Sequence, residues 1–235
     1  MNLYIKTIRT LIEHYPEALP HLKGRARWIA LTNSGDYKTY DYYLSTLERL
    51  VRSVYRGDIA GDFIDIMANL ISGQLTQAFT QAWNDEGTDG DMPPYLSAAL
   101  EDMILGEYEH VDGFYRDIID AVVDGTEIDP LITRCAIWAN RWNEAYNNAV
   151  ALIVKEMGGN LEWEYGDTEH CETCNSLNGI VARASEWEEL GVKPQSPPND
   201  ALDCGGWHCG CGLSPTTKRR SPNAYQRIMN AVTKV

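Results

Sequence analysis

The feature that most constrains this chain is a group of cysteines near its C-terminal end. Five of the six cysteines and two of the five histidines lie between residues 170 and 211. The group opens with Cys171-Glu172-Thr173-Cys174 and closes with Cys204-Gly205-Gly206-Trp207-His208-Cys209-Gly210-Cys211. A two-residue gap between cysteines lets one tight turn present two sulfurs to one zinc ion, at about 2.3 Å from it. The spacing therefore predicts a metal site.

The candidate ligands outnumber the four positions of a zinc ion. They are His170, Cys171, Cys174, Cys204, His208, Cys209 and Cys211. We expect Cys171 and Cys174 to bind as one pair, and two further sulfurs to come from Cys204, Cys209 and Cys211. The glycines between and after the later cysteines let the backbone bend closely around an ion. Four such ligands close the coordination shell, so the zinc is expected to be structural.

Disulfide bonds are the main alternative for the same cysteines, because thiols pair in an oxidising compartment. The first fifteen residues carry Lys6, Arg9 and Glu13 instead of the uninterrupted apolar segment of a secretory signal. We therefore expect a reducing cytosol and favour zinc over disulfides. Cys135 stands apart in an apolar helical context and is expected to be a small buried side chain.

No motif for zinc catalysis accompanies the cysteines. A helical His-Glu-x-x-His, which would supply two ligands and a general base, does not occur in the sequence. The His-x-Glu and Pro-Cys-x-x-Cys pair of a zinc deaminase is also missing. The sequence thus favours a metal that stabilises a small fold.

The rest of the chain has mainly helical periodicity. Apolar residues recur at helical spacing over 2–15, part of 21–31, 37–55, 59–83, 93–119 and 129–157. From Asn160 onward, short alternating segments predict strands at 161–165 and after the Leu177-Asn178-Gly179 turn, with a last helix after Ser221. We predict a mainly α protein, in which an N-terminal helical bundle, residues 1–157, precedes a small C-terminal α+β module, residues 158–235, stapled by one zinc.

Charge limits the partners that this chain can bind. The formal net charge is −14, and the segment 85–129 holds fourteen carboxylates against one basic residue, Arg116. Such a surface repels phosphate backbones, so nucleic-acid contact is not expected except through Lys218, Arg219 and Arg220. Another small basic cluster, Lys23, Arg25 and Arg27, lies near the start. No apolar segment reaches the roughly 18 to 20 residues that span a bilayer, and no membrane partner is expected.

The order of motifs in the C-terminal part resembles the phage head morphogenesis proteins, the Mu F-like minor head proteins. A long helix and a Trp-containing strand precede Asp167, the Cys171/Cys174 pair and the Leu177 to Gly179 turn. A proline-rich connector, Pro194 to Pro198, then leads to Cys204, Cys209 and Cys211. The resemblance covers about residues 130–215. Asn178 replaces the usual Asp, Gly210 stands where Arg is common, and the family's Arg-Thr-Glu is only loosely matched by Arg141-Trp142-Asn143-Glu144.

The resemblance implies a minor structural protein of a tailed phage or prophage, without catalysis. Its partners would be the portal protein and the major capsid or scaffold proteins. Its location would be the virion, at the head interior or the portal vertex, and the host cytoplasm during assembly. An acidic helical surface is compatible with this role because it would not adhere to packaged DNA.

Two other functions are weighed against this one. Some Mu F-like domains have been related to ADP-ribosyltransferase folds and some are fused to toxin domains, so Glu162 or Glu164 on the predicted strand would be the catalytic candidate. Alternating Glu is more often a solvated strand face. The second alternative is a zinc-ribbon nucleic-acid-binding module that holds phosphates with residues 218–220.

Overall fold

The computed structural model describes residues 40–58, 62–86, 90–166, 169–207 and 209–233. The helices expected over 2–15 and 21–31 therefore lie outside the described residues, as do Lys23, Arg25, Arg27, Asp167 and His208. All five cysteines of the predicted metal site are within the described residues.

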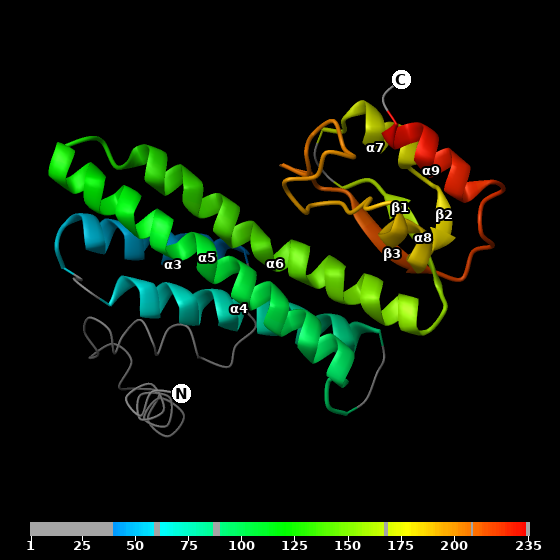
Figure 1. Ribbon diagram of the computed structural model, residues 1–235, viewed down its shortest axis with the longest axis horizontal. Helices are drawn as coiled ribbons and strands as arrows, with labels where there is room; N and C mark the ends of the chain where they lie inside the picture. Colours follow the sequence, from blue (N-terminus) through cyan, green and yellow to red (C-terminus); the bar gives the residue numbers. More distant parts are fainter. Residues whose placement is uncertain (1–39, 59–61, 87–89, 167–168, 208, 234–235) are drawn as a thin grey trace. The chain divides into compact units, whose positions relative to one another are not determined.

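Four long helices make up most of the described chain, in the positions that the apolar periodicity predicts. They are α3 (Tyr40–Tyr55), α4 (Phe63–Asp85), α5 (Pro94–Asp124) and α6 (Asp129–Glu156), all labelled in Figure 1. Pro94 is the first residue of α5, a position at which its missing N–H costs no helical hydrogen bond. Gly106 and Gly113 do not interrupt that helix.

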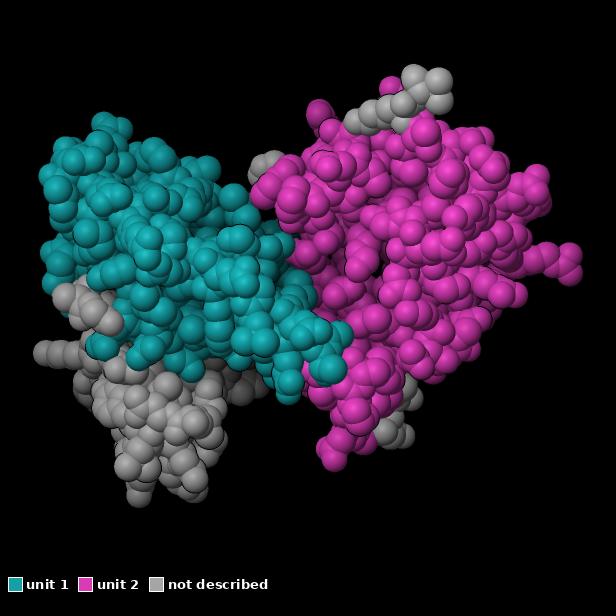
Figure 2. Space-filling model, in the orientation of Figure 1, with its two compact units in different colours: residues 1–77, 98–142 teal, residues 78–97, 143–235 magenta. Residues whose placement is uncertain are grey.

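The chain divides into two compact units, coloured separately in Figure 2. One unit holds the described residues up to Gln77 together with Ala98–Trp142, and the other holds Ala78–Ser97 together with Asn143–Val235. The C-terminal half of α6 thus belongs to the same unit as the cysteines. The domain boundary expected at residue 157 stays a prediction.

The first unit is a helical bundle with an apolar interior. Its largest fully buried side chains include Tyr43, Leu47, Phe63, Met67 and Phe114. Cys135 is fully buried, as expected for a small apolar side chain, and its thiol donates to the Leu131 carbonyl at 3.6 Å. Burial raises the pKa of this thiol to about 12, so Cys135 stays protonated and takes no part in thiolate chemistry.

The second unit contains a three-stranded antiparallel sheet and three short helices. The sheet order is β2-β1-β3. The strands are β1 (Asn160–Glu164), β2 (Val181–Arg183) and β3 (Gly212–Thr216), and the helices are α7 (Glu172–Leu177), α8 (Ala184–Glu189) and α9 (Ala224–Val232). In Figure 1, α7 and α9 lie side by side, and α9 also contacts β2. The predicted fold class, mainly α with a small C-terminal α+β module, is confirmed.

Two tryptophans form the centre of this module. Trp163 in β1 and Trp187 in α8 are almost fully buried, with ring centroids 5.8 Å apart. The Trp187 indole N–H donates to the Leu161 carbonyl at 3.2 Å, which satisfies its one buried donor. The module is joined to the second half of α6 by a Lys155–Glu188 ion pair of 2.7 Å and by a Ser196 hydroxyl that donates to Glu144 at 2.7 Å.

Three features of the module differ from what the sequence predicts. The first cysteine pair starts a short helix, α7, with Cys171 as its N-cap and Cys174 in its first turn, and a third strand, β3, follows the last cysteine. The proline-rich connector from Pro194 to Pro198 turns at Pro194–Gln195, with Gln195 at a φ of 56°, a turn that the spacing of its prolines does not predict. This turn lets the Gln195 amide donate to the Cys211 carbonyl at 2.9 Å.

Within the part of the chain that the structure describes, no helix is both long and apolar enough to cross a membrane.

Candidate metal centre

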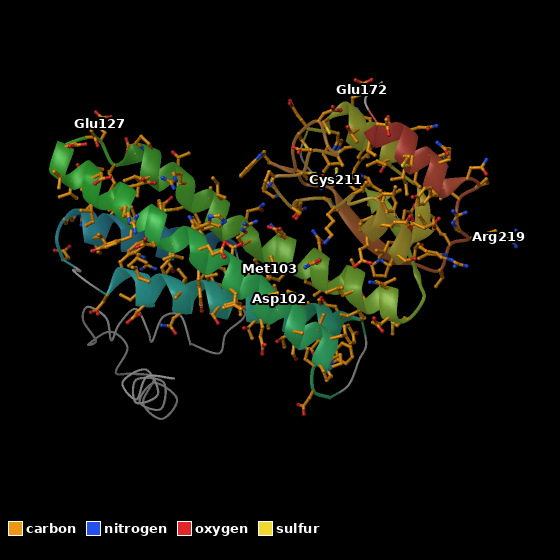
Figure 3. The ribbon with its side chains drawn as sticks, in the orientation of Figure 1. Asp102, Met103, Glu127, Glu172, Cys211 and Arg219 are labelled. Atoms are coloured by element: carbon orange, nitrogen blue, oxygen red, sulfur yellow. The ribbon has the colours of Figure 1, made fainter. Side chains whose placement is uncertain are left out.

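The five clustered cysteines come from three segments of the module. Cys171 precedes α7 as its N-cap, and Cys174 lies in its first turn. Cys204 lies in a turn of the long connection that follows α8, whereas Cys209 and Cys211 lead directly into β3. Figure 3 shows Cys211 within the module, on the segment that enters this strand. Residues about forty positions apart in sequence are thereby brought to one place.

The five sulfurs form two triads that share one member. Within the first, Cys171, Cys174 and Cys204, all three sulfurs lie within 4.8 Å of one another. The second, Cys174, Cys209 and Cys211, meets the same limit. Two sulfurs on one tetrahedral zinc are separated by about 3.8 Å, given Zn–S distances of about 2.3 Å. The sulfurs are thus close to the spacing that a shared ion requires.

Burial distinguishes the two triads. Cys174, Cys209 and Cys211 are buried, whereas Cys171 and Cys204 are partly exposed. All six cysteines of the chain are free thiols in the structure. The cluster of five thiols therefore has a buried side, formed by Cys174, Cys209 and Cys211, and a partly exposed side, formed by Cys171 and Cys204.

His170 adds a nitrogen next to the buried triad. Its Nδ1 lies 3.6 Å from the Cys211 sulfur. Its ring stacks on Tyr165 with centroids 3.9 Å apart, and the Tyr165 hydroxyl donates to Asn175 at 2.9 Å. These contacts place the imidazole beside Cys211.

Backbone N–H groups point at several of the sulfurs. The Cys174 N–H donates to the Cys171 sulfur at 3.4 Å. Backbone groups of Gly206 and Gly166 likewise hydrogen-bond Cys204 and Cys211. Such donors favour the charged form of a sulfur, which is the form that binds metal.

The sulfurs also hydrogen-bond to one another. The Cys174 thiol hydrogen-bonds to Cys209 and lowers the pKa of Cys209 to about 5, while the same contact raises the pKa of Cys174. Burial raises the pKa of Cys204 to about 11. Metal ions bind thiolates, so an ion held here would displace the proton of the hydrogen bond between Cys174 and Cys209.

Two contacts hold the cysteine-bearing segments together. The Asp203 carboxylate accepts from the Thr173 N–H at 2.9 Å and from the Thr173 hydroxyl at 2.6 Å, which ties α7 to the residue before Cys204. Gly166 lies so close to Gly210 that a Cβ at position 166 would sit 1.8 Å from the Gly210 carbonyl oxygen. Both contacts position the sulfurs without contributing a sulfur themselves.

The structure brings together Cys171, Cys174, Cys204, Cys209 and Cys211, all five cysteines that the sequence nominates as ligands. His208 lies outside the described residues. His170 was among the sequence candidates but not in the preferred ligand set, because nothing in the spacing shows which way an isolated histidine points. The contacts of Asp203 and Gly166 leave no signal in the sequence, since both depend on the path of a long connection.

The residues of the two alternative functions take part in ion pairs and hydrogen bonds of the module. Glu162 is buried and pairs with Lys218 at 2.6 Å, and Glu164 accepts from the Ser214 hydroxyl at 2.6 Å. Arg220 donates to Glu186, with its Nε 2.7 Å from the carboxylate. Arg219, which lies between Lys218 and Arg220 in the sequence, is labelled in Figure 3.

Comparison of this chain with protein-family models, with curated proteins and with solved structures returned no match.

Proposed function

We propose that the C-terminal module binds zinc through its cysteine cluster, and that the metal serves to hold the fold of the module. The observation that carries this proposal is the convergence of five cysteine sulfurs, from three segments, into two triads with a common member. Thiolate-rich sites select soft or borderline cations, among which zinc is the usual structural ion.

The arrangement favours a metal over disulfides. A disulfide joins two sulfurs at about 2.05 Å and leaves any neighbouring thiol without a partner. Here each pair has a third sulfur within 4.8 Å, and Cys174 is shared by both triads. One cation can bind three or four of these sulfurs at once. Disulfide formation joins them in pairs, so at least one of the five thiols would stay unpaired.

The metal is proposed to be structural because the cysteines surround it. An ion bound by these sulfurs ties the start of helix α7 to the segments that carry Cys204, Cys209 and Cys211. The module is also small, and its apolar core is centred on two tryptophans, so metal binding supplies folding free energy that a core of this size lacks.

Zinc analysis of purified, reduced protein tests this proposal. We expect stoichiometric zinc, and we expect Cys174→Ser to abolish binding, because Cys174 belongs to both triads. Cys135→Ser is the matched control, since this thiol is buried in the other unit and should leave the zinc content unchanged. Protein without stoichiometric metal would refute a zinc-dependent fold.

For the whole protein we propose the role of a phage minor head or head-morphogenesis protein, with the portal and the capsid or scaffold proteins as partners. The support is the order of motifs from the long helix to the last cysteines, together with the acidic helical segment. Co-purification with portal or procapsid, from infected or prophage-induced cells, is the test. A protein recovered only free in the lysate would contradict this role.

An ADP-ribosyltransferase-like function is less favoured by the contacts of the two candidate glutamates. A catalytic Glu has to be available to substrate, whereas Glu162 is 8% exposed and paired with Lys218. We expect no NAD hydrolysis, and no difference between the wild type and Glu164→Ala in such an assay.

A nucleic-acid-binding function is disfavoured by the ion pairs of Lys218 and Arg220 with Glu162 and Glu186. Cations that already have carboxylate partners release fewer counterions when they meet a phosphate backbone. We expect no salt-dependent binding to DNA.

A further inference from the structure

The cysteine cluster holds more donors than a single ion can use. One zinc takes four ligands, whereas five sulfurs converge here, and the His170 nitrogen lies beside one of them, the Cys211 sulfur. The sulfurs do not gather as one set of four but as two sets of three. The Cys174 sulfur belongs to both sets.

We propose that the module binds two zinc ions that share the Cys174 thiolate. The outer ion takes Cys171, Cys174 and Cys204, and the inner ion takes Cys174, Cys209, Cys211 and His170. This inference rests on the proposed function, because it concerns the same cluster, and it adds a second ion to it.

The inner set has three sulfurs within 4.8 Å of one another and a nitrogen, that of His170, beside one of them. Its three sulfurs are buried, and His170 Nδ1 lies 3.6 Å from the Cys211 sulfur. With Zn–S near 2.3 Å and Zn–N near 2.0–2.1 Å, a tetrahedral ion separates its nitrogen and sulfur ligands by about 3.6 Å. The stacking of His170 on Tyr165 holds the ring beside Cys211.

The outer set has three sulfurs and is open to solvent at one side. Cys171 and Cys204 are the two partly exposed cysteines of the cluster. Each accepts a backbone N–H bond, from Cys174 and from Gly206. A water molecule can therefore complete the four positions of the outer ion.

Charge also favours two ions over one. One Zn²⁺ with four thiolates, and the fifth cysteine as a neutral thiol, would leave a net charge of −2 in a partly buried place. Two Zn²⁺ with all five thiolates carry −1, and an uncompensated buried charge is costly. Each bound ion displaces protons from the thiols that it takes, so atoms and charge balance.

The test is the zinc content of the full-length protein after reconstitution under reducing conditions and removal of loosely bound metal. Two ions per chain are expected in the wild type. Cys171→Ser and Cys204→Ser should each reduce the content from two to one, whereas Cys174→Ser should reduce it to none. His170→Phe, which keeps an aromatic ring against Tyr165, should weaken the inner ion by at least about tenfold in chelator competition.

A measurement on the unaltered chain covers the case in which a variant does not fold. After exchange with ¹¹³Cd²⁺, the wild type should give two cadmium resonances coupled to each other through the shared sulfur. A single resonance with one ion per chain would overturn this inference and leave the proposed function standing. No bound metal at all would overturn both, and two uncoupled ions would contradict the sharing of Cys174.

Discussion

At the scale of single residues, the tightest steric constraint in the module lies between Gly166 and Gly210. A Cβ on residue 166 would overlap the backbone of residue 210, which lies between Cys209 and Cys211. Only the missing side chain of glycine permits this approach. The absence of a side chain at position 166 therefore lets the segment with Cys209 and Cys211 lie close to the chain that leads to Cys171 and Cys174.

Gly166→Ala is expected to destabilise the module and weaken its zinc binding, because the two backbones have to separate. Overpacking of this kind costs about 1–3 kcal/mol or more. Thermal unfolding of the zinc-bound protein and chelator competition measure the effect. Gly212→Ala is the control, since a Cβ there has no atom within 4 Å. Equal behaviour of the two variants would contradict the steric account.

Glu186 supplies a prediction about pH. Its carboxylate accepts from Arg220 and from the Arg183 N–H, and the Arg220 hydrogen bonds lower the pKa of Glu186 below its ordinary 4.5. A carboxylate whose pKa is lowered on folding stabilises the protein above its unfolded pKa, and this contribution is lost as the pH falls through the folded value.

At pH 7 the free energy of unfolding of Glu186→Gln should therefore be lower than that of the wild type by about 0.5–1.5 kcal/mol. The difference between the two proteins should shrink as the pH falls below about 4.5. Chemical denaturation of both proteins at several pH values checks this, and the comparison cancels the acid release of metal that affects both equally. A difference that grows at low pH would have the wrong sign.

At the scale of elements, the cysteines are positioned by short segments that have no strong signal of their own. Helix α7 has six residues and strand β2 has three. Helices of this length are not stable alone, so they depend on the contacts at their ends. The Asp203–Thr173 contact is one of these, and it joins the two segments that carry Cys171, Cys174 and Cys204.

Asp203→Ala should weaken zinc binding by about tenfold or more, in the range found for residues that orient metal ligands. The variant leaves the Thr173 N–H and hydroxyl without this acceptor, so α7 loses its tie to the Cys204 segment. Asp200→Ala, an exposed carboxylate in the same connection, is the control. Unchanged chelator competition in Asp203→Ala would show that the contact does not position the ligands.

The sequence was informative about elements in proportion to their length. Helices α3 to α6 could be predicted because apolar side chains repeat over many turns, and β1 because Leu161 and Trp163 alternate with Glu162 and Glu164. The cysteine cluster could be predicted from spacing. Helix α7 and strand β3 could not, because six or five residues do not establish a period, and their formation depends on partners distant in sequence.

The same limit applies to the candidate site. Spacing indicates that Cys171 and Cys174 can share an ion, but the sharing of Cys174 between two triads is a property of the three-dimensional path. Glu162 was expected on a solvated face and is instead buried against Lys218, which lies 56 residues later in the chain.

At the scale of the whole molecule, we expect the fold of the second unit, but not that of the first, to depend on bound metal. The first unit is a helical bundle with an apolar core, whereas the five clustered cysteines all lie in the second. A chelator should therefore remove the near-ultraviolet signal of Trp163 and Trp187 while most of the helical far-ultraviolet signal remains. Simultaneous loss of both signals would mean that the bundle also depends on the metal.

The most direct test of the account is the metal content of reduced, purified protein, measured together with the near-ultraviolet circular dichroism of the same sample before and after a strong chelator. At least one zinc per chain is expected, and the contribution of Trp163 and Trp187 to the tryptophan signal should be lost when the zinc is removed. Protein that carries no stoichiometric metal, and whose tryptophan environment is unchanged by the chelator, would contradict it.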